Sequence, residues 1–222
     1  MKKDILPQAN DWNRFWKSEQ TQTSSNVSWS KRRIMNILTP YVGVGKKALD
    51  AGCGSGFFSR YFCDSGMETV SLDYSEESLK MAQAFTQGRA KIIQADLLSD
   101  DLKTYVDERF DVIFSDGLLE HFEPDQQNKI LKNFSSLLSP DGVIVTFVPN
   151  RWSPWELIRP FFMPGIKEVP FVLNQLVALN QHNGLKVIRQ GGINTFPFAF
   201  SPDKFVGHLW GMLLYTIAKK ND

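Results

Sequence analysis

The sequence predicts an α/β fold: a doubly wound, mostly parallel seven-stranded sheet with helices on both faces, plus a cap made of an N-terminal segment and an insertion. Two observations predict this class. Between residues 46 and 150, short apolar runs alternate with amphipathic helical segments, which is the pattern of repeated βα units. The run at residues 143–148 is apolar on both faces, so the sheet that contains it must be covered from both sides.

Each element has its own signal. Strands are expected where apolar residues cluster between turn residues, at residues 48–51, 69–73, 91–95, 110–115, 143–148, 185–189 and 212–218. Helices are expected where apolar residues recur at helical spacing, at residues 30–38, 57–64, 75–84, 124–138 and 172–181. Ser75, followed by two glutamates, marks a helix start, because acids are favoured in the first turn. The Ser-Pro-Asp-Gly sequence at residues 139–142 predicts a turn.

The chain divides into four expected parts: an N-terminal arm and cap helix (1–45), a ligand-binding Rossmann-like core (46–150), an inserted lid (151–184) and the last two strands (185–222). The first 30 residues are polar but contain Trp12, Phe15, Trp16 and Trp29, and we expect this segment to dock through these aromatic side chains. The basic run at residues 31–33 is expected to be a solvated helix face.

Composition excludes several classes of protein. The 222 residues carry a formal net charge of +1, which gives no reason to expect a nucleic-acid partner. No run approaches the roughly 18 apolar residues that a membrane span needs, and no secretory signal is visible. Cys53 and Cys63 are too few for a disulfide framework or a zinc site. We therefore expect a cytoplasmic protein, as a monomer or homodimer.

A glycine-rich turn follows the first expected strand and precedes a helix; it comprises Asp50, Ala51, Gly52, Cys53, Gly54, Ser55 and Gly56. Glycines let a ligand approach bare backbone, and the N–H groups of the following helix attract an anionic group. A dinucleotide is disfavoured, because its fingerprint needs a glycine where Phe57 stands and because Asp50 would repel a pyrophosphate. A ligand with an amino-acid moiety would instead offer an ammonium group to Asp50 and a carboxylate to the helix.

Residues 48–59 resemble motif I of the class I S-adenosylmethionine-dependent methyltransferases, and the resemblance extends to about residue 150. Asp73 and Asp96 follow the next two strands, so three acids meet at the carboxyl edge where such sheets bind ligands. The resemblance implies S-adenosylmethionine as the cofactor. It also implies that Asp73 accepts hydrogen bonds from the ribose hydroxyls, that Tyr74 packs against adenine, and that Asp96 and the Leu97 N–H bind the adenine edge.

The segment after the fourth strand resembles motif IV of the same family, which implies backbone contacts from Asp116, Gly117 and Leu118 to the methionine part of the cofactor. The Glu120-His121 pair is similar to one in the ubiquinone-pathway O-methyltransferases, which place another Glu three residues earlier and bind a divalent metal. Gly117 stands at that position, so no metal is expected. His121 is the candidate general base and Glu120 its catalytic partner; alternatively, both residues order the loop.

These observations predict methyl transfer from S-adenosylmethionine to an oxygen or nitrogen nucleophile of a small-molecule acceptor by in-line displacement. Two alternatives remain: a NAD(P)-binding oxidoreductase and a non-catalytic S-adenosylmethionine-binding protein. The segment directly after strand 110–115 reads Ser-Asp-Gly-Leu, and it therefore lacks the Asp/Asn-Pro-Pro-aromatic element of amino-methylating nucleic-acid enzymes. No membrane span is expected, but the apolar run at residues 155–164 raises the hypothesis of a weak contact with a membrane surface.

Overall fold

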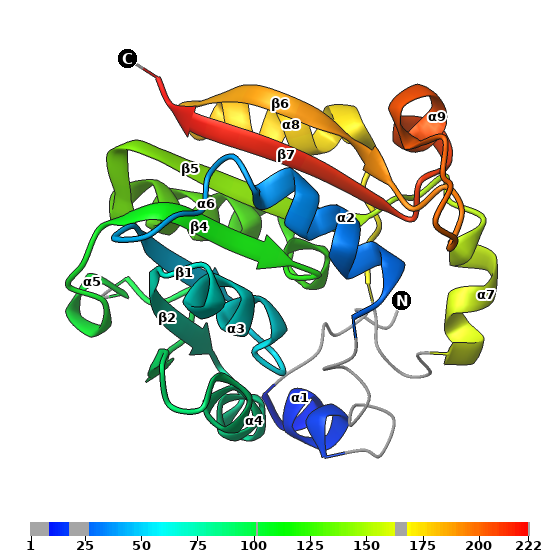
Figure 1. Cartoon of the computed structure of the whole chain (residues 1–222). Coiled ribbons are helices and arrows are strands. Elements are labelled where there is room, and N and C mark those ends of the chain that lie inside the picture. Colours follow the sequence, from blue (N-terminus) through cyan, green and yellow to red (C-terminus); the bar gives the residue numbers. More distant parts are fainter. Residues whose placement is uncertain (1–8, 18–26, 101, 163–167, 222) are drawn as a thin grey trace, which may run out of the picture.

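In the computed structural model, the chain forms one seven-stranded sheet with the order β3-β2-β1-β4-β5-β7-β6 (Figure 1). The structure describes residues 9–17, 27–100, 102–162 and 168–221. Strands β1 to β5 pair in parallel, whereas β7 runs antiparallel to both of its neighbours, β5 and β6. The predicted fold class, a mostly parallel seven-stranded α/β sheet, is confirmed.

The strands are β1 (Lys47–Ala51), β2 (Glu68–Asp73), β3 (Lys91–Gln94), β4 (Phe110–Asp116), β5 (Leu138–Pro149), β6 (Leu185–Ile193) and β7 (Leu213–Lys220). The α-helices are α1 (Ala9–Trp16), α2 (Trp29–Leu38), α3 (Phe57–Asp64), α4 (Glu76–Thr86), α5 (Leu102–Tyr105), α6 (Pro124–Leu137), α7 (Trp155–Phe162), α8 (Leu173–His182) and α9 (Asp203–Trp210); a short 3₁₀ helix, η2, spans Leu119–His121.

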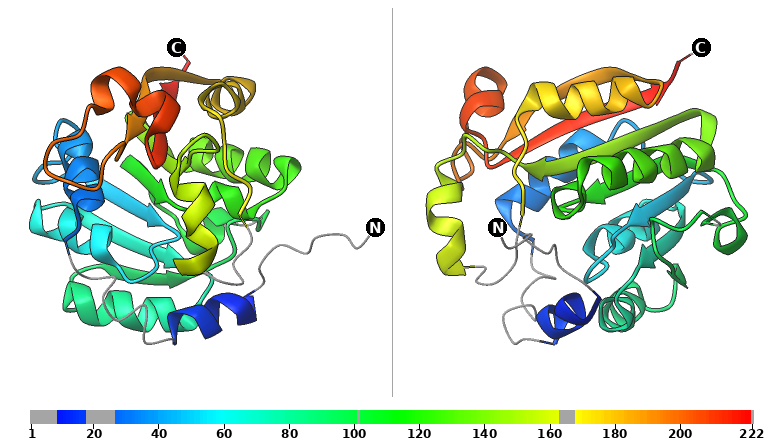
Figure 2. Two further views of the ribbon diagram at one scale, coloured as in Figure 1. Left: turned by 90° about the vertical axis from the view of Figure 1, so that its right-hand side faces the viewer. Right: turned by 180° about the vertical axis from the view of Figure 1, so that it is seen from behind.

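Two apolar cores lie on opposite faces of the sheet, as a doubly wound fold requires. On one face α2 and α3 pack on the strands, and Phe62 and Phe114 lie in this core. On the other face α6 and α8 pack, with Phe134 and Leu176 among the buried side chains. Neighbouring residues of one strand point to opposite cores, since Ala48 belongs to the first and Leu49 to the second. Figure 2 shows α6 and α8 covering the rear face.

The predicted turn at residues 139–142 is wrong: these residues lie inside β5. Phe110 pairs with Leu138 but Val112 pairs with Val143, so the extra residues of β5 form a bulge. A side chain at Gly142 would lie 2.7 Å from the Phe110 carbonyl oxygen, which explains the glycine there. The residues expected to form a turn therefore allow β5 to approach β4 closely, and they do not end a strand.

The boundaries of the longer elements agree with prediction to within a few residues, and α3 has the predicted bounds. The exceptions are β5, which begins at Leu138, five residues before its predicted start, and β6, which continues to Ile193, four residues beyond its predicted end. Four short helices were not predicted, namely α5, η2, α7 and α9. α5 and η2, with four and three residues, are too short to show a helical period in the sequence, so packing must determine them. α7 and α9 have eight residues each, as α3 does, but their segments were predicted only as parts of a lid and of a connection between strands. The division of the chain into core, cap and lid stays a prediction.

One edge of the sheet positions the functional residues. Because β1, β2 and β4 are parallel, the loops that follow them meet at their shared carboxyl edge. The segments after β5 and β6 also leave the sheet there, since β6 is antiparallel to β7 and β7 to β5. Helix α1 packs on α4 beside this edge (Figure 1).

Candidate functional site

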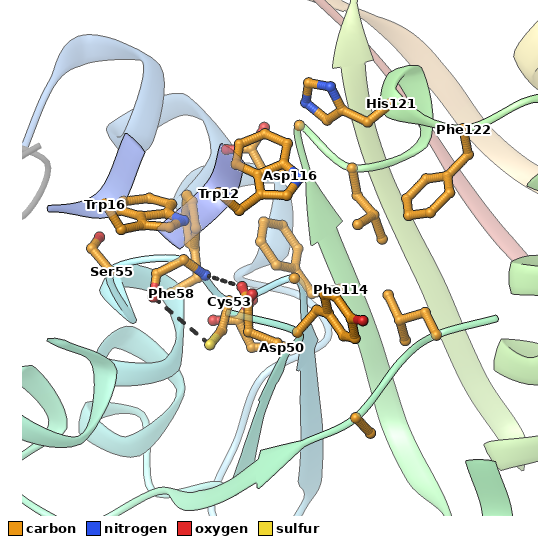
Figure 3. Close-up of a pocket in the computed structure, with 18 of the residues that line it drawn as sticks. Trp12, Trp16, Asp50, Cys53, Ser55, Phe58, Phe114, Asp116, His121 and Phe122 are labelled. Atoms are coloured by element: carbon orange, nitrogen blue, oxygen red, sulfur yellow. Dashed lines mark hydrogen bonds between the residues drawn. The ribbon is translucent and has the colours of Figure 1, made fainter. Parts of the chain in front are cut away.

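A cavity of about 410 Å³ opens at the carboxyl edge of the sheet (Figure 3). Its walls come from the loops after β1, β2, β3 and β4 and from helices α1 and α2. Twelve of the predicted site residues line it, namely Asp50, Gly52, Cys53, Gly54, Asp73, Tyr74, Asp96, Leu97, Asp116, Gly117, Leu118 and His121. The cavity lining does not include Ala51, Gly56 or Glu120.

The glycine turn forms the floor of the cavity. The Gly52 and Cys53 N–H groups donate to the Leu72 carbonyl at 2.8 and 3.1 Å, which folds the turn back onto β2. Gly54 has a φ of +50°, and a side chain there would lie 2.6 Å from the Trp16 ring. Glycine at this position therefore leaves bare backbone facing the cavity, covered by an indole of α1.

Gly56 has a different role from the one that the motif suggested. Its φ is +78°, and a side chain there would lie 2.6 Å from the Ala82 Cα of α4. This glycine allows α3 to pack closely against α4, and it does not reach the cavity. Ala51 is fully buried at the end of β1 and supports the turn from below.

Asp73 ties together two walls of the cavity. Its Oδ2 accepts from the Gly54 N–H at 3.0 Å, and its Oδ1 accepts from the Ser75 N–H at 2.9 Å. Burial raises the pKa of Asp73, and these two N–H donors oppose that rise. The N-cap of α4 is Ser75, whose hydroxyl accepts from the Ser78 N–H, so Asp73 is not the helix cap.

Asp50 is buried beneath the turn and belongs to a chain of hydroxyl groups. The Ser59 hydroxyl donates to Asp50 Oδ2 at 2.6 Å, and the Ser71 hydroxyl donates to Ser59 at 2.7 Å. Burial raises the pKa of Asp50 to about 7; the bond from Ser59 opposes the shift, and the nearby Asp73 adds to it. A cationic group in the cavity would favour the ionised form.

The residues after β2 and β3 form the open side of the cavity. Tyr74 exposes about half of its surface, 51%. Asp96 is exposed, and its Oδ1 accepts from the Leu98 N–H at 2.8 Å, whereas Leu97 is buried. The cavity therefore offers an aromatic face, a carboxylate and buried backbone next to one another at this end.

A lysine of α2 completes the cavity, and here the expectation of a solvated basic run is wrong. Lys31 lines the cavity, and its Nζ lies 4.0 Å from the centre of the Phe57 ring. Burial lowers the pKa of Lys31 to about 8, while Asp116 opposes that shift. In turn, burial raises the pKa of Asp116 to about 7, opposed by Lys31. No sequence motif marked Lys31, because its electrostatic interaction with Asp116 joins distant segments.

The predicted catalytic pair is split by the structure. His121 lines the cavity, and its ring meets that of Trp12 edge-on, with centroids 4.7 Å apart. Glu120 is only 2% exposed, and its Oε1 lies 4.0 Å from His121 Nε2, beyond hydrogen-bond distance. Burial raises the pKa of Glu120 well above its usual value, with further increases from Glu168 and Asp116. Glu120 is therefore absent from the cavity lining, although its carboxyl lies close to His121 and Gly117 of that lining.

Helix α1 is anchored over the cavity by polar contacts. The Ser75 hydroxyl donates to Asn13 Oδ1 at 2.6 Å, and Lys17 lies 3.5 Å from Glu77. These contacts place Trp12 and Trp16 on the cavity wall, as Figure 3 shows. The prediction that the N-terminal arm docks by its aromatic side chains is confirmed for these two residues.

The described residues contain no group of three or more His, Cys, Asp or Glu side chains that could hold a metal ion. Glu120 and His121 are neighbours, but Gly117, at the position of the third acid, has no side chain to contribute. The chemistry available to the described residues is thus that of a half-buried lysine, several carboxyls and one imidazole around an aromatic cavity.

Residues 49–146 match a family model described as a methyltransferase domain. Over 65% of its length the chain is 31% identical to a ubiquinone biosynthesis O-methyltransferase from Leptothrix cholodnii, covering 59% of that protein. It is also 36% identical to the Idiomarina loihiensis protein of the same name, over 48% of this chain and 44% of that one. The chain thus spans roughly half the length of the curated relatives that it matches.

Among solved structures, the chain resembles the N-methyltransferase NodS from Bradyrhizobium japonicum, which was crystallised with S-adenosyl-L-homocysteine. The TM-score is 0.69, with 14% sequence identity over 96% of this chain and 98% of that one. At this identity the likeness shows a shared fold. The family match and the curated relatives favour a methyltransferase over the NAD(P)-binding alternative.

Proposed function

We propose that this chain, which belongs to the class I S-adenosylmethionine-dependent methyltransferases, transfers the methyl group of that cofactor to an oxygen or nitrogen nucleophile of a small molecule. The observation that carries the proposal is the cavity itself. Three carboxyls, Asp50, Asp73 and Asp96, and a glycine turn converge at one edge of the sheet, next to Lys31. This donor and acceptor set matches a nucleoside joined to an amino acid.

The residues of the cavity fit the two ends of S-adenosylmethionine. Asp73 keeps lone pairs for the ribose hydroxyls beyond the two bonds that it accepts from backbone. Tyr74, Asp96 and the Leu97 N–H would hold adenine. At the other end, the Asp50 carboxylate would meet the ammonium group and Lys31 the carboxylate, with the backbone at residues 116–118 beside the methionine chain.

The bound cofactor supplies an electrophilic methyl group on a sulfonium, so the protein's part is to align the acceptor and to exclude water. Trp12 and Phe122 line the side of the cavity that holds His121. The His121 imidazole would accept the proton of an acceptor hydroxyl as the new O–CH₃ bond forms. Glu120 would act indirectly by ordering η2, because it lies outside the cavity.

The first listed relatives are named as O-methyltransferases, and this supports a hydroxyl acceptor as the first class to test. A cytoplasmic location and a monomeric or homodimeric state belong to the same proposal. Both cysteines, Cys53 and Cys63, are free thiols, as in a reducing compartment. Within the described residues, no helix has the length and apolar character needed to cross a bilayer.

The test has two stages. Calorimetric titration of the purified chain with S-adenosylhomocysteine and with NADH should show binding of the first ligand alone. A library of small hydroxyl and amine compounds, with S-adenosylmethionine present, should then release S-adenosylhomocysteine for at least one acceptor. Binding without any turnover would favour a non-catalytic binder, and no binding at millimolar ligand would refute the proposal.

A further inference from the structure

A group of exposed apolar side chains lies on segments that the proposed function does not use. It comprises Trp152, Leu157, Ile158, Phe196, Phe198, Phe200, Phe205, Leu209 and Trp210, and we call it the apolar rim. The first three follow β5 and the other six follow β6, so both segments lie at the edge of the sheet that holds the cavity. Figure 2, left, shows α7, α9 and the loop before α9 on one side of the molecule.

Hydrogen bonds join the two segments of the rim to each other and to the core. The buried Asn150 side chain donates to the Leu209 and Gly211 carbonyls at 3.1 and 2.9 Å. Arg33 of α2 lies 3.2 Å from Asp203 and donates to the Phe198 carbonyl. The segments are therefore fixed by polar groups, while their apolar side chains point outward.

The rim costs free energy in water, because it leaves large apolar groups without contacts. Leu157, Phe200 and Phe205 each expose 79% of their surface. Single exposed apolar residues are common, but nine on two segments that hydrogen bonds join to each other indicate an interaction surface. In α9, Phe205 and Leu209 stand four residues apart and share one outward face. Short helices with such faces lie in the interface of a membrane.

The charges of the rim favour an anionic partner. Of the described acids in these segments, Asp203 is paired with Arg33, while Glu156 and Glu168 are paired with Arg159. Arg151 and Lys204 are exposed cations next to the apolar side chains. Cations that flank inserted aromatic residues attract the headgroups of acidic phospholipids.

We propose that the apolar rim docks this protein onto an anionic lipid surface. A second protein copy would need a groove that matches the protruding side chains, whereas a lipid interface accepts them without one. Docking in this way turns the edge of the sheet that carries the cavity toward the headgroups. The inference goes beyond the proposed function and does not depend on it, because lipid binding requires neither cofactor nor acceptor.

The test is co-sedimentation of the full chain with vesicles of phosphatidylcholine mixed with phosphatidylglycerol, and with vesicles of phosphatidylcholine alone. We expect the protein to pellet with the mixed vesicles and to remain in solution without vesicles. The double variant Phe200→Ser/Phe205→Ser should lose affinity by at least about tenfold. The double variant Arg151→Glu/Lys204→Glu should lose binding to the mixed vesicles, and added salt should weaken the wild type.

The matched control is Tyr105→Ser, which removes an exposed aromatic residue of α5, before β4 and thus at the opposite edge; its binding should equal that of the wild type. Circular dichroism and S-adenosylhomocysteine binding verify that each variant is folded. Failure of the wild type to pellet with mixed vesicles would overturn the proposal. The proposal would also be overturned if the Phe200/Phe205 variant bound mixed vesicles as tightly as the wild type. A variant that lost self-association but kept lipid binding would have the same consequence.

Discussion

The two halves of the cavity are held in different ways. In the half that follows β1 and β2, backbone N–H groups make the contacts: Asp73 accepts from Gly54 and Ser75, and the glycine turn bonds back to the Leu72 carbonyl. In the half around η2, the contacts come from side chains, since the Trp12 ring packs on the His121 ring. Glu120 is buried in this half, and its Oε2 has no hydrogen-bond partner among the described residues.

This difference separates a fixed part from an adjustable part. Backbone donors cannot be changed by substitution, so the first half suits a ligand that stays the same. A wall made of side chains from η2 and α1 can be altered residue by residue, so the second half suits the acceptor. If the comparison is right, substitutions in the first half change cofactor affinity, and those in the second change turnover.

The largest effect is expected at Asp73. Replacement by Ala removes the acceptor for two backbone N–H groups and, in the proposed function, for the ribose hydroxyls. Hydrogen bonds to charged groups contribute about 1.5–3 kcal/mol each, so S-adenosylhomocysteine affinity should fall by at least about a hundredfold in calorimetry. Asp96→Ala, at an exposed carboxylate, should lose less. Equal losses for the two variants would mean that Asp73 does not organise this half.

Two glycines of the same turn should give opposite results. Gly56→Ala places a methyl group 2.6 Å from Ala82 Cα at a φ of +78°, and should lower the free energy of unfolding in urea by about 2 kcal/mol. Its folded fraction should still bind S-adenosylhomocysteine. In Gly54→Ala, at a φ of +50°, the three atoms nearest to the new methyl group all belong to the Trp16 ring at the cavity wall, so this variant should mainly weaken ligand binding. If Gly56→Ala abolished binding without loss of stability, the placement of Gly56 away from the cavity would be contradicted.

Much of the fold was predictable because its signals are local. The apolar periods of α3 and α6 and the Ser75 cap mark helix positions within a few residues. The turn predicted at residues 139–142 failed because pairing of β5 with β4, which is not local, continued the strand through it. The ends of β6 and the short helices likewise depend on their neighbours in space.

The site divides in the same way. Gly54 and Asp73 were predicted to lie at the site because both follow a local signal. Gly54 belongs to the glycine-rich turn after the first strand, and Asp73 ends the next strand at the expected spacing. Lys31 was missed because it approaches Asp116 only after α2 packs on the sheet, and in sequence it stands in a basic run that resembles a solvated face. Glu120 was given a catalytic role from its position next to His121; its carboxyl is buried and does not line the cavity, and its role in catalysis stays a prediction.

A smaller effect, on turnover instead of binding, is expected at Trp12. Trp12→Ala should lower kcat/KM for the acceptor by about tenfold, because it opens the cavity to water and frees the His121 ring. Trp12→Phe should restore most of the activity, and S-adenosylhomocysteine affinity should change less than twofold in both. Trp29→Ala, at an exposed tryptophan of α2, is the control and should behave as wild type. A loss of cofactor affinity equal to the loss of kcat/KM would place Trp12 in the cofactor half.

The last effect is a gradual one and concerns pH. Burial raises the pKa of Asp50 from 3.8 to about 7 in the folded protein. Between the pKa of the unfolded chain and that of the folded protein, the folded protein keeps the proton of this carboxyl while the unfolded chain loses it. The protonated group therefore contributes its full stability below the unfolded pKa, and this contribution is lost as pH rises through the folded pKa. The free energy of unfolding should therefore decrease between about pH 4 and about pH 7, by at most about 1.4 kcal/mol per pH unit for this group.

Asp50→Asn keeps an oxygen to accept from Ser59 and should flatten the slope measured by urea unfolding at a series of pH values. Asp116, whose pKa is also raised to about 7, should account for a remaining slope. S-adenosylmethionine should suppress the Asp50 part, because its ammonium group would favour the ionised carboxylate. An unchanged slope in Asp50→Asn, with and without the cofactor, would show that this carboxyl is already ionised beneath the glycine turn.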